Sequence, residues 1–138
     1  MTTIIQPALA MVALTFMVWC YMYFKRLNFI RVHSIDPQSV ATRALGAKSL
    51  AEVSAPSDNP MNLFELPVLF YVLVVLLLLT GEASHGFVTA AWAYVVLRAL
   101  HSFIHCTYNQ VLHRFTVYAA SSVVLWAMWA VFAARLLS

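Results

Sequence analysis

Four long runs of apolar residues dominate the sequence, and two of them are interrupted by a single charged residue, Glu65 or Arg98. A helix needs about 20 predominantly apolar residues to cross the hydrocarbon core of a bilayer. Each run is long enough, so the sequence predicts an all-α integral membrane protein with four spans. The expected spans are residues 4–24, 60–80, 86–107 and 115–135.

The composition excludes several other classes of protein. Hydrophobic residues make up 63% of the chain and charged residues only 9%, whereas an ordinary soluble domain is about 25% charged. The net charge of +3 comes from 8 basic and 5 acidic residues, too few for a nucleic-acid-binding surface. Cys20 and Cys106 lie in apolar segments without the spacing of a zinc site or a disulfide framework. We therefore expect membrane lipids around the protein, no nucleic-acid partner and no metal.

The connections between the runs predict how the helices are arranged. The second and third connections are short, which makes neighbouring helices antiparallel, as in an up-and-down four-helix bundle. The first connection, residues 25–59, is polar and favours a short helix over 37–50. The N-terminus lacks the basic region of a secretory signal, so we expect the first span to be retained. The whole chain, 1–138, is expected to form one transmembrane domain.

Basic residues are distributed unevenly between the two ends of such a bundle. With four spans, connections one and three share a side, and together with Arg114 they hold six of the eight basic residues. The second connection carries no Lys or Arg. The positive-inside rule then places the loop 25–59 in the cytoplasm and both termini on the non-cytoplasmic side.

Polar residues gather near the expected cytoplasmic ends of the helices. A charge at membrane depth is costly and is seldom left without a partner, so Glu65 and Arg98 are candidates for a functional role or a structural ion pair. On the third span, a polar stripe occupies an arc of about 80° at the helical period of 100° per residue. Its members are Tyr94, Arg98, His101, His105 and Tyr108.

These residue types suit a small anionic, peptide-like ligand. Arginines bind carboxylates, a glutamate accepts an amine, and an asparagine hydrogen-bonds a peptide backbone. A lipophilic second substrate can reach such a site laterally from the bilayer. The alternative interpretation is structural, with a buried ion pair and histidines that hydrogen-bond within the bundle.

Two motifs carry a resemblance to a known superfamily. Asn62-Leu63-Phe64-Glu65-Leu66-Pro67 is similar to its N-x-x-E motif, and Arg98-x-x-His101-x-x-x-His105 is similar to its R-x-x-[HY]-x-x-x-Y motif. Arg114 follows Arg98 by sixteen residues, as a second arginine does in one branch. The sequence thus resembles the membrane-associated proteins in eicosanoid and glutathione metabolism, which include the microsomal glutathione transferases, leukotriene C4 synthase and microsomal prostaglandin E synthase.

The resemblance implies a homotrimer that binds glutathione, as co-substrate, between adjacent protomers at the cytoplasmic side. Arg114 would be the catalytic residue, a fixed cation that stabilises the thiolate. The implied reaction is conjugation, isomerisation or peroxide reduction of a lipophilic electrophile. The implied glutathione-binding residues are Arg26, Asn62, Glu65, Arg98, His101, His105 and Tyr108.

Two departures from the family pattern keep other functions open. The two arginines of the family's E-R-x-x-R-x-x-x-N signature fall on Ala55 and Asp58, and its closing tyrosine is His105. They favour an alternative, a non-catalytic member of the fold that binds a lipid or another anion. A haem protein would need histidines from another subunit, because His101 and His105 share one helix. A proton-coupled exporter would use Glu65, but pairing with Arg98 argues against that role.

Overall fold

The computed structural model describes residues 2–34, 65–108 and 110–137. A short 3-10 turn, η1 (Thr2–Ile4), leads into the first of four α-helices in these ranges. The expected helix over 37–50, the expected helix start at Pro60 and the candidate Asn62 all lie outside the described residues. The four helices are α1 (Ile5–Val32), α4 (Leu66–Thr80), α5 (His85–Cys106) and α6 (Val111–Leu137).

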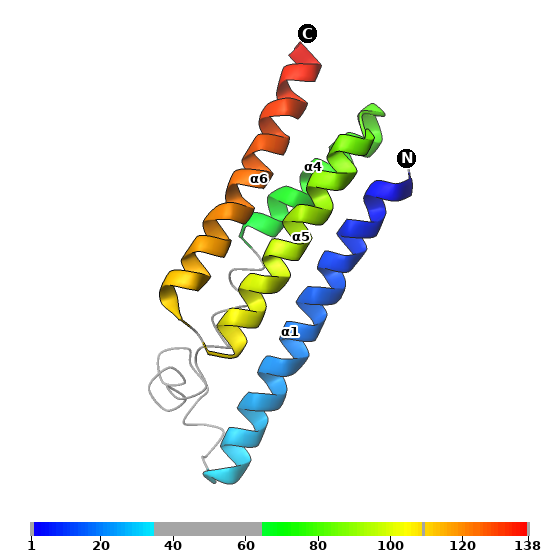
Figure 1. Ribbon diagram of the computed structural model, residues 1–138. Helices are drawn as coiled ribbons and strands as arrows, with labels where there is room; N and C mark the ends of the chain where they lie inside the picture. Colours follow the sequence, from blue (N-terminus) through cyan, green and yellow to red (C-terminus); the bar gives the residue numbers. More distant parts are fainter. Residues whose placement is uncertain (1, 35–64, 109, 138) are drawn as a thin grey trace.

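The helices run alternately up and down, and the two ends of the chain lie at the same end of the bundle (Figure 1). Helix α1 packs against α4 and α5, and α6 packs against the same two helices. Helices α1, α5 and α6 are long and apolar enough to cross a membrane, whereas α4 is a shorter apolar helix. These findings confirm the predicted all-α membrane bundle and its up-and-down order.

The first helix is longer than the predicted span. It continues eight residues past Phe24 and ends at Val32, so the expected start of the first connection at residue 25 is wrong. The physical reason is that charge marks the limit of the hydrocarbon core, while Lys and Arg are themselves good helix formers. Arg26 and Arg31 therefore lie on α1 rather than in a loop.

The second predicted span differs at its start. Glu65 is the N-cap of α4, which places Pro67 in the first helical turn. A proline in the first turn removes no intrahelical hydrogen bond, so Pro67 is compatible with a regular start of α4. The helix ends at Gly81, whose φ of +75° is the left-handed C-terminal conformation that glycine adopts without a steric penalty.

Helix α5 is the most buried of the three long helices. In its most apolar 18-residue window, 44% of the residues are buried, against 17% in α1 and 22% in α6. The ring of Tyr94 on α5 stacks on Phe70 of α4 with centroids 4.7 Å apart. Leu73, Leu77 and Leu125 complete this part of the core. The polar residues Arg98, His101 and His105 lie on the buried face of α5, so they face protein and not lipid.

Candidate functional site

The polar stripe of α5 is buried along most of its length. Tyr94 and Arg98 are 0% exposed, His105 is 1% exposed and His101 is 2% exposed. Tyr108 follows the end of α5 and is exposed, and its hydroxyl lies 3.3 Å from Nδ1 of His113. The helix therefore brings four of the five predicted residues into the bundle interior and leaves Tyr108 at the end of the bundle.

Arg98 has aromatic rings around its guanidinium. Its guanidinium carbon is 5.5 Å from the ring centroid of Tyr118 on α6, a distance at which a cation is attracted to the face of the ring. The charge of Glu65, the exposed N-cap of α4, adds a weaker electrostatic attraction. Residues from three helices thus contribute to the surroundings of this buried charge.

His101 connects α5 to the first turns of α6. Its Nδ1 lies 3.2 Å from the backbone carbonyl oxygen of Arg114. A carbonyl oxygen only accepts hydrogen bonds, so Nδ1 carries the proton and donates it, and in the neutral ring Nε2 is an acceptor. Nε2 is buried and has no hydrogen-bond partner among the residues that the structure describes. The His101 ring also lies 5.7 Å from the ring of Tyr118.

A small hollow lies beside His101, where α5 and α6 meet. Its volume is about 210 Å³. Arg114 contributes a half-buried cation, and aromatic side chains form much of the wall. The residues that line it are His101, Val111, Arg114, Phe115 and Tyr118.

The remaining candidates lie at the same end of the bundle, or outside the described residues. Arg26 is half-buried on α1, five residues beyond Tyr21, whose hydroxyl donates to the carbonyl of Cys106 at the end of α5 (3.2 Å). Glu65 is exposed. Asn62 lies outside the described residues.

Tyr118 is a site residue that the sequence analysis missed. It contacts both His101 and Arg98 and lines the hollow. Its spacing in the sequence could have identified it as a site residue, because Tyr118 follows Arg114 by four residues and therefore shares a face of α6 with it.

Comparison with protein families matches the chain to one family. The model of the MAPEG family, the membrane-associated proteins in eicosanoid and glutathione metabolism, matches residues 4–134. The match covers nearly the whole chain and all four helices. Searches of curated proteins and of solved structures gave no match. The bundle, its buried polar stripe and this match together lead to one conclusion: the chain is an integral membrane protein that belongs to the MAPEG family.

Proposed function

We propose that the chain is a glutathione-dependent membrane transferase or peroxidase that acts on lipophilic electrophiles, with Arg114 stabilising the thiolate. The observation that carries the proposal is the hollow in which Arg114 lies beside His101 and Tyr118. Glutathione is the co-substrate, and its sulfur would lie near the Arg114 guanidinium. Membership of the MAPEG family supports this class of activity.

The position of Arg114 within α6 favours an anion at this hollow. Arg114 lies in the fourth position of the helix that begins at Val111. The N-terminal end of a helix carries a partial positive charge, so a cation there is not stabilised by the helix. Both charges instead favour a negatively charged ligand atom, such as a thiolate, at the same place.

The size of the hollow favours a site completed by a second copy of the chain. Ligand pockets have volumes of about 300–1,000 Å³, and this hollow holds about 210 Å³. We propose a homotrimer in which glutathione lies between adjacent protomers. One protomer would contribute Asn62, Glu65, Arg98, His101, His105 and Tyr108 to the glutathione site. Its neighbour would contribute Arg26.

The distribution of basic residues supports one orientation of the bundle in the membrane. We propose that the end bearing Arg114 faces the cytoplasm and that both termini lie on the other side, in keeping with the excess of basic residues near the Arg114 end. A lipophilic electrophile would then reach the thiolate laterally from the bilayer.

One observation favours a second candidate function. Ala55 and Asp58 occupy positions where the family motif has arginines, and arginines are strong ligands for the carboxylates of a peptide. A chain without them is a candidate for a non-catalytic MAPEG protein that binds a lipid or another anionic ligand at the same hollow.

Calorimetry of glutathione binding to the detergent-purified protein, with ultraviolet absorbance of the thiolate followed in parallel, distinguishes the two functions. The enzyme proposal expects a Kd of about 1 mM or below, equivalent to at least about 4 kcal/mol, and a thiolate signal. Arg114→Ala is expected to remove the thiolate signal, whereas Arg135→Ala at the far end of α6 keeps it. Binding without thiolate formation, or no binding, supports the non-catalytic alternative.

A further inference from the structure

A second hollow of the bundle lies far from Arg114, at the end where the chain terminates. It is a groove of about 430 Å³ between α5 and α6. Arg135, at one of its ends, follows Arg114 by 21 residues on α6, or about 31 Å at 1.5 Å per residue. Its walls are apolar and mostly small, from Ala90, Ala93, Val124, Ala127, Met128 and Val131.

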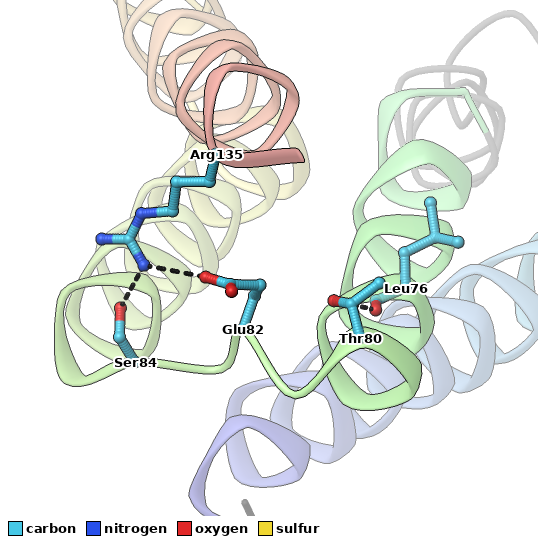
Figure 2. A network of polar contacts seen from close by, with 5 residues as sticks. All are labelled: Leu76, Thr80, Glu82, Ser84 and Arg135. Atoms are coloured by element: carbon cyan, nitrogen blue, oxygen red, sulfur yellow. Dashed lines mark hydrogen bonds and ion pairs between the residues drawn. The ribbon is translucent and has the colours of Figure 1, made fainter. Parts of the chain in front are cut away.

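Two opposite charges stand at the end of this groove. Arg135 donates to Oε2 of Glu82 (3.3 Å) and to the hydroxyl of Ser84 (3.4 Å), and Figure 2 shows the guanidinium reaching from α6 across to both residues. The guanidinium carbon also lies 5.2 Å from the ring centroid of Phe87. These three contacts hold the Arg135 side chain at the groove.

The ion pair remains accessible to a ligand. The side chains of Arg135 and Glu82 are 45% and 38% exposed. A purely anionic headgroup would be attracted by Arg135 but repelled by Glu82. A headgroup that carries both a phosphate and a primary ammonium would instead find an opposite charge for each of its own.

From this charge pattern and the apolar groove beneath it we infer that the chain binds a phospholipid of the phosphatidylethanolamine class between α5 and α6. The phosphate lies at Arg135, the ammonium lies at Glu82, and one acyl chain follows the groove. Along α5 the groove runs from Gly86 to Ala93, a rise of about 10 Å. That is a third of the hydrocarbon core of about 30 Å, so the groove holds the part of the chain next to the headgroup.

Native mass spectrometry of the delipidated, full-length protein tests this inference. We would titrate it with phosphatidylethanolamine, phosphatidylcholine and phosphatidylglycerol that carry identical acyl chains. The expected result is one tightly bound phosphatidylethanolamine, with an affinity about tenfold above that of the other two lipids, the usual size of a charge-assisted contact. Equal affinities for the three lipids would overturn the headgroup assignment.

Charge variants test the two headgroup contacts separately. Glu82→Gln is expected to weaken phosphatidylethanolamine and to strengthen phosphatidylglycerol, because the repulsion of an anion is removed. Arg135→Gln is expected to weaken both lipids, while Arg31→Gln, an exposed arginine at the opposite end, serves as the matched control. If Glu82→Gln left the order of the lipids unchanged, the ammonium contact would be wrong.

Bulky variants test the groove. Ala93→Phe and Ala127→Phe, one on each wall and both exposed, are expected to remove binding of all three lipids. Ala130→Phe, on an exposed part of α6 that is not among the groove residues, should have no effect. Binding that survived both groove variants would overturn the site, as would a groove variant that changed the mass of the protein assembly, since the groove would then be an interface between copies.

Discussion

The side chain of His101 on α5 contacts the backbone of Arg114 on α6, with Nδ1 of the histidine 3.2 Å from the carbonyl oxygen of the arginine. The contact bridges 13 residues of sequence and crosses the turn between the two helices. It fixes the tautomer of the histidine, and it also fixes the backbone from which the Arg114 side chain extends. The position of the proposed catalytic cation therefore depends on His101 as well as on α6.

The first prediction separates the hydrogen bond that His101 donates from the shape of its ring. Asn places an amide donor close to the position of Nδ1, whereas Phe keeps only the shape of the ring. We expect His101→Asn to retain most of the thiolate signal with glutathione. His101→Phe should lower the free energy of unfolding by about 1–3 kcal/mol, since it leaves a carbonyl without its side-chain donor, and should weaken the thiolate signal. Equal behaviour of the two variants would show that the Arg114 carbonyl contact does not position the site.

A second prediction concerns the Tyr94 hydroxyl, which is buried and has no hydrogen-bond partner in the part of the chain that the structure describes. Removing a buried polar group that lacks a partner is neutral or stabilising. We expect Tyr94→Phe to leave Tm unchanged or to raise it. Tyr21→Phe is the comparison variant, because its hydroxyl donates to the carbonyl of Cys106, and it should lower stability by about 1 kcal/mol. A Tyr94→Phe variant that is the less stable of the two would mean that this hydroxyl binds a buried water or ligand.

A double-mutant cycle is expected to detect the attraction between Glu65 and Arg98. Glu65→Gln, Arg98→Met and the double variant would be compared by thermal unfolding in detergent without glutathione. Because the two side chains interact electrostatically, the changes in unfolding free energy should deviate from additivity by about 0.5 kcal/mol or more. Glu82→Gln combined with Arg98→Met is the matched control and should be additive. Additivity in both cycles would remove Glu65 from the surroundings of Arg98.

The proposed orientation gives a fourth prediction, measured by labelling single cysteines with a membrane-impermeant thiol reagent. In a background of Cys20→Ala and Cys106→Ala, we expect Ser34→Cys, after α1, to react only from the cytoplasmic side. Ala83→Cys, between α4 and α5, should react only from the opposite side. Sealed vesicles of both orientations provide the comparison, and the reverse pattern would invert the proposed topology.

A fifth prediction tests whether the site is shared between copies. Arg26→Ala and Arg114→Ala should each be inactive in glutathione conjugation when present alone. If Arg26 and Arg114 of one site come from different protomers, mixed assemblies of the two variants contain some intact sites and recover part of the activity. Recovery is measured after co-expression with two different affinity tags. No recovery would place both arginines of a site in one protomer.

The helices could be predicted from the sequence because hydrophobic length alone decides what fits in a bilayer. The boundaries were harder, since α1 continues through Lys25 and Arg26 to Val32. Hydropathy indicates where the chain passes from lipid to water, whereas the end of a helix depends on capping and backbone conformation. Pro67 illustrates the same point, because its effect depends on whether it lies in the first turn or in the interior of a helix.

The polar stripe of α5 was also visible in the sequence, because helical periodicity places Arg98, His101 and His105 on one face. Contacts between helices were not visible. Tyr118 and Arg98 come together only because α5 and α6 pack at one rotation and register, and the ion pair of Arg135 with Glu82 joins residues 53 positions apart. Periodicity within one helix carries no information on the register of its neighbour.

The polar face that α5 buries has a consequence for how the protein enters the membrane during synthesis. Arg98 alone costs about 2.5–3.5 kcal/mol at the centre of an inserting helix, and the histidines of α5 add to this barrier. Helix α6 follows after only residues 107–110 and supplies the ring of Tyr118 against Arg98. We expect α5 and α6 to integrate together as a helical hairpin, so that α5 expressed without α6 fails to be retained in the bilayer.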